Sequence, residues 1–213
     1  QGQINNSYIF VVDGYYKKIS EMVDFKPGAS FLYNTSFDDL LERIKVNAFG
    51  IETFLIKRTG KFTGSLSYTY SRSKREWATP AGLIWIPSNA DRPHSANITM
   101  KYYMTEKLSV GLNWIFISGS PATIYIHETF YGKWFETKNN IRYPDYHRLD
   151  LSMRRTFTIN KFFINLEFDV CNVYNRKNTF YLQEVYDENR KTFIYRNVSL
   201  FPVMPSLTLT IKY

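Results

Sequence analysis

The sequence predicts an all-β protein: a transmembrane antiparallel β-barrel, with about eight strands in this chain. Apolar and polar residues alternate over several long segments, short turns separate many of them, and aromatic residues make up 18% of the chain. The final segment alternates to its last residue, with Leu207, Leu209, Ile211 and Tyr213 on one side and Ser, Thr and Lys on the other. A period of two places consecutive side chains on opposite faces of a strand. A barrel wall between lipid and a polar lumen requires that sorting.

Eight segments are expected as strands, each close to the ~9–11 residues that a tilted strand needs to cross a bilayer. A soluble antiparallel sandwich also alternates, but its strands average about 5–6 residues. The apolar sides are also unusually aromatic here. The expected strands span residues 7–18, 45–58, 61–72, 95–104, 107–117, 147–157, 161–172 and 206–213. Residues expected on the lipid side or in its aromatic girdles are Trp114, Phe168, Leu207, Leu209, Ile211 and Tyr213.

Composition agrees with this class and narrows the partners. The mean hydropathy is −0.33, and no run approaches the ~18 apolar residues of a membrane helix. The formal net charge is +8, but the basic residues are scattered among strand ends and loops. That distribution favours solvated or lipopolysaccharide-facing charge and no nucleic-acid partner. The single Cys171 excludes an intrachain disulfide.

Short and long connections alternate along the chain, as in barrels with short periplasmic turns and longer outside loops. Residues 38–43 have some helical character, and 180–186 with 192–198 are expected to form a protruding hairpin. Brief turns are expected at 59–60, 105–107 and 159–160, and long connections at 19–43, 73–94, 119–146 and 174–202.

The long connection 119–146 is the best candidate for ligand contact, because aromatic side chains on an outside loop can stack on a sugar, a peptide side chain or a cofactor ring. Packing of the loop on itself or on a protein partner is an equally good explanation. The residues concerned are Tyr125, His127, Phe130, Tyr131, Trp134 and Phe135.

The side expected to face the lumen carries opposite charges on neighbouring strands. A two-residue turn at 159–160 places even-numbered residues before it and odd-numbered residues after it on one face. Arg148 and Arg154 are therefore each expected within ion-pair distance of Glu167 or Asp169. A network that holds the wall and a polar track along a substrate path both fit this pattern. The full lumenal set is Glu52, Lys101, Arg148, Asp150, Arg154, Asn165, Glu167 and Asp169.

No catalytic, metal or cofactor site is expected. His94, His127 and His147 lack the close spacing of metal ligands. The sequence contains neither a G-x-S-x-G nucleophile setting nor a Gly-rich phosphate loop. An outer-membrane hydrolase is the enzymatic alternative, and it would need His147, Asp150 and a serine in hydrogen-bond contact.

Seven motifs, taken in order and spacing, resemble the C-terminal third of the barrel in TonB-dependent outer-membrane receptors of Bacteroidota. The resemblance covers residues 8–213. Its motifs are Gly50-Ile-Glu52, IKRTGKFTG at 56–64, YTYSRS at 68–73, DRPH at 91–94, YHRLD at 146–150, YNRKN at 174–178 and LFPVMP at 200–205.

The resemblance implies a 22-stranded barrel, closed by an N-terminal plug, in the outer membrane of a Gram-negative bacterium. The implied function is TonB-dependent uptake of a scarce nutrient: a siderophore, cofactor, glycan or peptide. Implied partners are outer-membrane lipid and lipopolysaccharide, the remainder of the barrel and its plug, TonB and, in some members, a surface lipoprotein lid. This chain would supply barrel wall and extracellular loops from about the last eight strands.

The alternative to a barrel segment is a small closed eight-stranded outer-membrane barrel with a structural or adhesive role, because ~8 strands can close around their own side chains. The chain starts without the charged and apolar regions of a secretory leader. Gln1 is therefore expected to be a mature terminus or an internal position of a longer chain.

Overall fold

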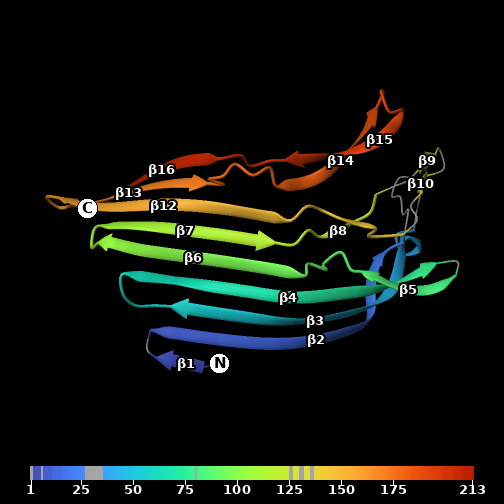
Figure 1. Ribbon diagram of the computed structural model, residues 1–213, viewed down its shortest axis with the longest axis horizontal. Helices are drawn as coiled ribbons and strands as arrows, with labels where there is room; N and C mark the ends of the chain where they lie inside the picture. The colour runs from blue at the N-terminus through green and yellow to red at the C-terminus, as the bar shows by residue number, and fades with distance from the viewer. Residues whose placement is uncertain are drawn as a thin grey trace.

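The structure is a computed structural model that describes residues 2–5, 7–26, 36–79, 81–124, 127–129, 132–134 and 137–213. Its main element is a ten-stranded antiparallel sheet in the order β1-β2-β3-β4-β6-β7-β12-β13-β16, with β5 paired to β4 (Figure 1). The strands are β1 (Gly2–Asn5), β2 (Tyr8–Phe25), β3 (Leu41–Lys57), β4 (Phe62–Thr79), β5 (Gly82–Pro87), β6 (His94–Thr105), β7 (Leu108–Ile117), β12 (Tyr146–Ile159), β13 (Phe162–Cys171) and β16 (Met204–Lys212).

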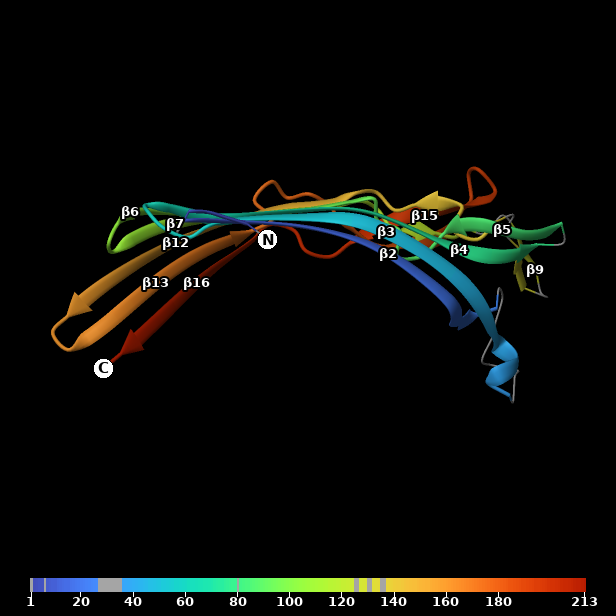
Figure 2. The same ribbon diagram turned by 90° about the horizontal axis from the view of Figure 1, so that it is seen from below.

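The all-β, antiparallel prediction is confirmed, and each of the eight expected strands is present, as β2, β3, β4, β6, β7, β12, β13 and β16. Short turns lie at one end of the sheet and longer connections at the other, which we call the turn end and the loop end (Figure 1). The sheet is arched rather than flat (Figure 2).

Smaller elements occupy the loop end. The expected hairpin is present as β14 (Thr179–Asp187) with β15 (Thr192–Ser199). The other pairs are β8 (Pro121–Ala122) with β11 (Ile141–Arg142) and β9 (His127–Thr129) with β10 (Gly132–Trp134). The helical character expected at 38–43 is limited to one 3-10 turn, η1 (Asp38–Leu40), because β3 already begins at Leu41.

Two of the expected long connections contain strand, which corrects the prediction: 19–43 is strand at both of its ends, and most of 73–94 is strand. β2 runs on to Phe25 opposite β3, and β4 runs on to Thr79, where β5 returns beside it. The register of β2 with β3 shifts between Ile19 and Met22. A bulge of this kind interrupts the period-two pattern, which is why the predicted strand stops at residue 18, just before the shift.

The turns keep the expected faces although their positions differ slightly. Ile159 pairs with Phe162, so the two-residue turn is Asn160-Lys161, one residue later than predicted; Asn160 has the left-handed φ of 54°. Between β6 and β7 the turn is Glu106-Lys107, and a register shift between Tyr103 and Thr105 supplies the extra residue. Both turns keep the alternation of faces from which the lumenal residues were predicted.

Few apolar side chains of the described residues are buried, and those gather at the loop end: Leu40, Ile44, Val46, Trp77 and Ile86. Along the sheet itself, large apolar residues remain exposed; Leu207, Leu209 and Ile211 are 68%, 59% and 57% exposed. Among the described residues, β1 and β16 pair only with β2 and β13, so the sheet has two open edges and no closed barrel forms. The closed eight-stranded alternative therefore has no support in this structure.

Candidate functional site

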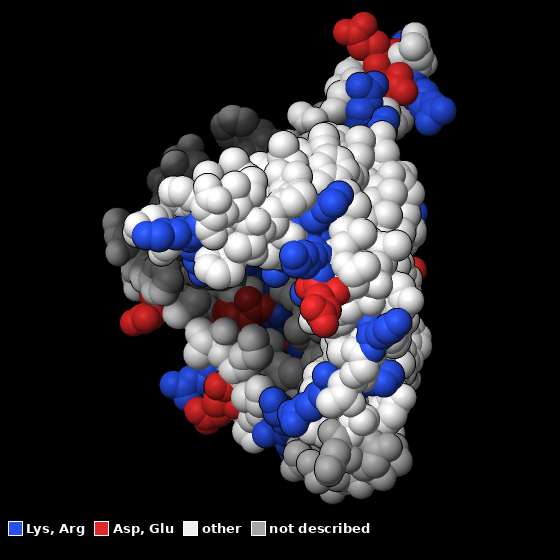
Figure 3. Space-filling model, turned by 90° about the vertical axis from the view of Figure 1, so that its left-hand side faces the viewer, with Lys and Arg blue, Asp and Glu red and all other residues white. Residues whose placement is uncertain are grey.

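Strand register sorts the side chains of the sheet into a polar face and an apolar face. One row across four strand pairs reads Lys101, Gly111, Ser152, Asp169 and Ser206. The neighbouring row on the opposite face reads Met100, Leu112, Leu151, Val170 and Pro205. Seen along the strands, charged side chains gather in the hollow of the arch, and the outer surface at the right of the view is mostly uncharged (Figure 3). The polar face is thus the concave one.

The central part of the polar face forms a groove of about 470 Å³ between β6, β7, β12 and β13. Its floor is made of small residues, because Gly111 and Ser152 face each other. A Cβ atom added at Gly111 would lie 2.3 Å from Ser152 Oγ, so a larger residue here would require the Ser152 hydroxyl to move. Lys101, Asp150, Arg154, Glu167 and Asp169 supply its charges.

The predicted pairing of Arg154 is confirmed. Its guanidinium donates to both carboxylate oxygens of Glu167, at 2.8 Å (Nη2 to Oε1) and 2.6 Å (Nη2 to Oε2), and its Nε donates to Oε2 at 3.1 Å. The two residues are direct partners in the register of β12 with β13. This bidentate pair joins neighbouring strands across the wall.

The predicted pairing of Arg148 with Glu167 or Asp169 is wrong. Arg148 instead bonds Asp150 on its own strand, with Nε at 3.0 Å and Nη2 at 2.9 Å from Oδ2. The register pairs Ser152 with Asp169. Arg148 therefore lies four residues, roughly 13 Å, along the strand from the position opposite that acid.

The remaining predicted lumenal residues are not joined into one network. Asn165 Oδ1 accepts a 2.8 Å hydrogen bond from Thr156. Lys101 Nζ lies 4.9 Å from the centre of the Tyr103 ring. Within the described part of the chain, the structure records no ion pair for Glu52, Lys101 or Asp169. Among the described residues, the polar face thus combines ion pairs with charges for which no ionic partner is recorded.

A double-mutant cycle at Arg154 and Glu167 is expected to give a coupling free energy of about 0.5–1 kcal/mol, because both side chains are partly exposed in this chain. The variants are Arg154→Ala, Glu167→Ala and their combination, with unfolding followed by urea titration. The matched control is Arg155→Ala with Glu167→Ala, since Arg155 belongs to the other face. A coupling as small as that of the control would contradict the pairing.

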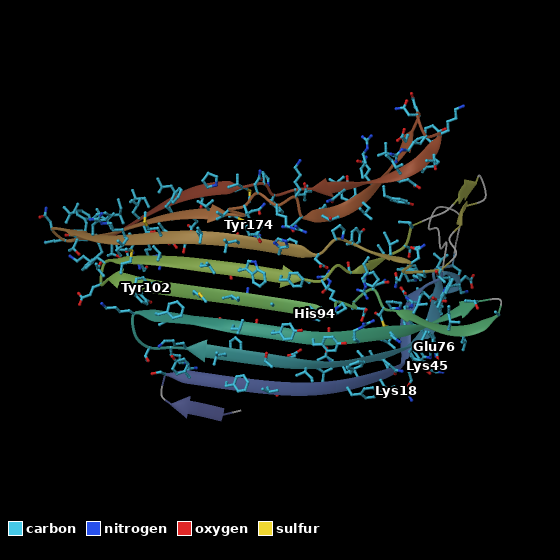
Figure 4. All side chains as sticks on the ribbon, in the orientation of Figure 1. Lys18, Lys45, Glu76, His94, Tyr102 and Tyr174 are labelled. Atoms are coloured by element: carbon cyan, nitrogen blue, oxygen red, sulfur yellow. The ribbon has the colours of Figure 1, made fainter. Side chains whose placement is uncertain are left out.

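The apolar face is bordered by aromatic residues at both ends. At the loop end, His94 Nδ1 and Tyr68 Oη lie 2.8 Å apart, as do His147 Nδ1 and Tyr174 Oη. At the turn end, Phe162 and Tyr213 pack with ring centres 5.4 Å apart. These two groups form what we call the aromatic borders; Figure 4 shows Tyr102 toward one end of the sheet and His94 and Tyr174 nearer its middle.

The apolar band between the borders is roughly 26 Å long along β6, because eight residues separate His94 from Tyr102. Trp114, stacked on Phe116 at 6.1 Å, lies on this face toward the loop end, and Phe168 pairs with Leu207 in the band. Arg155 also has the parity of this face, and its guanidinium packs on the Phe157 ring at 4.9 Å near the turn end. The apolar part of such an Arg side chain lies along apolar surface, and its guanidinium reaches water.

Two buried ionic clusters fix the loop end. Arg75, 2% exposed, donates to Asp24 on β2 and, at 2.9 Å, to Glu42 on β3. Lys138 Nζ reaches the same Asp24 carboxylate at 3.3 Å. Lys45 and Glu76, at 3.3 Å, pair nearby (Figure 4). The β2–β3 hairpin is thereby attached both to β4 and to the loop that precedes β11.

The second cluster surrounds Asp91, which is 1% exposed. Its carboxylate accepts hydrogen bonds from Ser73 N–H at 2.6 Å, from Arg72 Nε at 3.3 Å and from Arg142. Asn139 lies beside this cluster and donates to Pro87 O at 2.7 Å. The β4–β5 hairpin and the segment leading to β12 are held together by these contacts.

Stability at the loop end is expected to fall in acid. Burial raises the pKa of the Asp24 carboxyl, but hydrogen bonds from Arg75 and the Phe25 N–H, together with the charges of Lys138 and Arg75, outweigh burial and lower that pKa below its ordinary value. A lowered folded-state pKa contributes stability above the unfolded-state value of about 3.9. That contribution is lost as the pH falls through the folded-state pKa. Limited proteolysis of the β2–β3 hairpin between pH 7 and pH 2 measures the loss, and Asp24→Asn should weaken its pH dependence.

Most of the aromatic loop residues proposed for ligand contact lie outside the described residues: Tyr125, Phe130, Tyr131 and Phe135. His127 and Trp134 belong to β9 and β10, of which only the backbone is described. Their role stays a prediction. His147 and Asp150 lie on opposite faces of β12, and the described structure records no hydrogen bond between them. The hydrolase alternative therefore has no His–Asp pair at these positions.

Sequence reasoning missed the most buried polar residues, Asp91, Arg75 and Asn172. Asn172 has no exposed surface and a left-handed φ of 55°. An asparagine at the end of a predicted strand is a signal for such a conformation, and Asp91 opens one of the motifs named above. No pattern in the sequence near Arg75 indicated that this residue would be buried.

Among the described residues, no helix has the length and apolarity needed to cross a membrane. No protein-family model matches the chain, and a search of curated proteins gave no match.

Proposed function

We propose that this chain is the C-terminal part of a TonB-dependent outer-membrane importer of the Bacteroidota type, and that it supplies about eight strands of a 22-stranded barrel with their extracellular loops. The concave polar face lines the lumen, and the convex apolar face contacts lipid and lipopolysaccharide. The remainder of the barrel, a plug and the TonB contact belong to other parts of the same protein. The imported nutrient is a siderophore, cofactor, glycan or peptide.

The observation that carries the proposal is the pairing of one apolar, aromatic-bordered face with one charged face on an arched sheet whose two edges are open. A water-soluble sheet would cover residues such as Leu207 and Leu209 with a second layer. An open sheet in lipid would leave the backbone groups of β1 and β16 unpaired, at several kcal/mol each. Further strands of the same barrel would pair with the backbone groups of both edges, as the proposal of a barrel segment requires.

The face assignment is tested in isolated outer membranes with a fluorophore on single cysteines. In a Cys171→Ser background, Thr208→Cys and Leu209→Cys place the label on adjacent residues of β16 that point to opposite faces. Lipid-attached nitroxide should quench the label at position 209 and leave the label at 208 nearly unchanged. Equal quenching at both positions would contradict a lipid-facing wall.

Size and energy dependence test the importer itself. The protein carrying this sequence should have an intact mass several times the 25.2 kDa of the chain, and its substrate uptake should stop when TonB is deleted. A mature outer-membrane protein of about 25 kDa, or uptake that does not depend on TonB, would refute the proposal.

A further inference from the structure

Two hollows lie side by side on the apolar face, next to the turn between β3 and β4. The first hollow encloses about 400 Å³, and Leu55, Leu66 and Ile98, which are neighbours across β3, β4 and β6, line it. The second hollow encloses about 420 Å³ and is lined mainly by residues of β6, β7, β12 and β13. Phe62 and Met100 line both hollows and therefore separate them. A hollow gives an apolar chain more close contacts than a flat surface does.

The first hollow is built into the backbone of the sheet. Lys57, Gly64 and Met100 are direct partners across β3, β4 and β6, so a glycine stands between two long side chains. A Cβ atom added at Gly64 would lie 2.3 Å from Thr99 O, which is a backbone atom. A larger residue at position 64 would therefore push β4 away from β6. The close approach of these two strands keeps the hollow free of a side chain.

Positive charge lies directly beside the first hollow. Lys57 lines it at the end of β3, and the Lys57 Nζ donates to Thr59 O at 2.9 Å. An ammonium group has three N–H donors, so the same Nζ can also bind an acceptor that enters the hollow. The turn adds Arg58 and Lys61, and the sequence from 53 to 75 contains no Asp or Glu. The turn is therefore suited to an anion that is attached to an apolar chain.

We propose that this site binds one phospholipid of net negative charge, with its phosphate at Lys57 and its two acyl chains in the two hollows. Lysine binds phosphate as a compact positive charge. The row from Lys57 to Met100 spans two strand spacings, about 10 Å, so a headgroup at the turn leaves one chain on each side of Met100. Under the proposed function, on which this inference rests, the apolar face contacts lipid and the short turns lie in the periplasm. The site therefore belongs to the periplasmic leaflet.

The charges of the turn select the headgroup. A zwitterionic headgroup carries a cation of its own, which the basic residues of the turn repel, whereas phosphatidylglycerol carries only the negative charge of its phosphate. Each basic residue near a membrane surface adds to the attraction for anionic lipid. A free phosphate has no chain for the hollows, so only surface charges that salt screens would hold it.

The test uses the full natural chain that contains this sequence, purified in detergent and analysed by native mass spectrometry. The probes are phosphatidylglycerol and phosphatidylcholine with the same palmitoyl and oleoyl chains, and glycerol 1-phosphate. One phosphatidylglycerol molecule should stay bound per protein, with an affinity at least about fivefold higher than that of phosphatidylcholine. Equal affinities for the two lipids would overturn the headgroup assignment. Glycerol 1-phosphate that binds as tightly as phosphatidylglycerol would show that the hollows hold no chain, and would also overturn the proposal.

Two variants localise the lipid, each with a matched control. Lys57→Gln should lower the affinity for phosphatidylglycerol about fivefold, the contribution of one basic residue at a membrane surface. Lys107→Gln, in the turn before β7, should change it less than about twofold. Leu55→Trp fills the first hollow and should weaken the binding of both lipids at least about threefold. Leu207→Trp, on the apolar face of β16 outside both hollows, should not. An affinity for phosphatidylglycerol that either Lys57→Gln or Leu55→Trp leaves unchanged would contradict the site.

The outcomes separate this inference from the importer proposal. Lipid quenching at position 209 with TonB-dependent uptake, but without a preference for phosphatidylglycerol, would reject the lipid site alone. Phosphatidylglycerol binding that is lost in Lys57→Gln, in a protein whose uptake does not depend on TonB, would reject the importer alone.

Discussion

Leu209→Arg is expected to destabilise the assembled protein by about 2–4 kcal/mol, because it places a guanidinium near the centre of the apolar band, which the proposed function turns toward lipid. Leu209 is 59% exposed and pairs with Leu166 in the register of β13 with β16. The neighbouring substitution Thr208→Arg is the control: position 208 lies opposite Glu167 on the polar face. Its expected effect is within ~0.5 kcal/mol, in either direction.

The two variants are compared as the full natural chain, by urea unfolding in lipid vesicles and by the amount of folded protein in the outer membrane. The test compares two adjacent positions of β16. Both variants introduce the same residue, so a difference in stability between them cannot come from β-propensity or from the level of expression. If Thr208→Arg were the more damaging variant, the faces would be assigned the wrong way round.

Asp91→Ala is expected to lower the free energy of unfolding by about 3 kcal/mol, or to detach the loop end. Removing one partner of a buried ion pair leaves the other charges without compensation, which typically costs ~3–5 kcal/mol. The lower value applies because Arg72 and Arg142 are each 35% exposed and regain some hydration. The Ser73 N–H would lose its acceptor as well.

Hydrogen exchange is the suitable measurement, because it reports each segment separately. The amides of the β4–β5 hairpin and of the segment before β12 should exchange faster in Asp91→Ala, while those of β13 and β16 should not change. The control is Asp39→Ala, at an exposed position of η1. An effect spread evenly over the whole sheet would show that Asp91 does not act as a local clamp.

The sequence predicted the sheet well because its signal is local. In β16 and β13 each residue reports its own face, so Glu167 and Thr208 could be placed on one side, and Phe168 and Leu207 on the other, before any partner was known. Parity across the Asn160-Lys161 turn then brought Arg154 to Glu167. The position of the turn was off by one residue, yet the faces remained correct, because register depends on parity rather than on the exact turn.

The prediction for Arg148 failed because parity fixes the face but not the position along the strand. The extension of β2 was missed for a related reason: its shift between Ile19 and Met22 removes the alternation by which a strand is recognised. The hairpin of β4 with β5 was taken for a loop because its charged residues form contacts at the loop end instead of alternating cleanly.

The sequence alone determined which side chains share a face, because a β-strand turns every second residue the same way whatever surrounds it. Only the tertiary structure decided which polar groups meet at the loop end. Arg75 reaches Asp24, and Arg142 reaches Asp91, each across 51 residues of chain. Asn172 donates its N–H to Asp150 on β12 and its side-chain amide to Phe201 O, 29 residues further along the chain. Contacts between distant segments depend on the path of several connections at once, and no local pattern in the chain encodes that path.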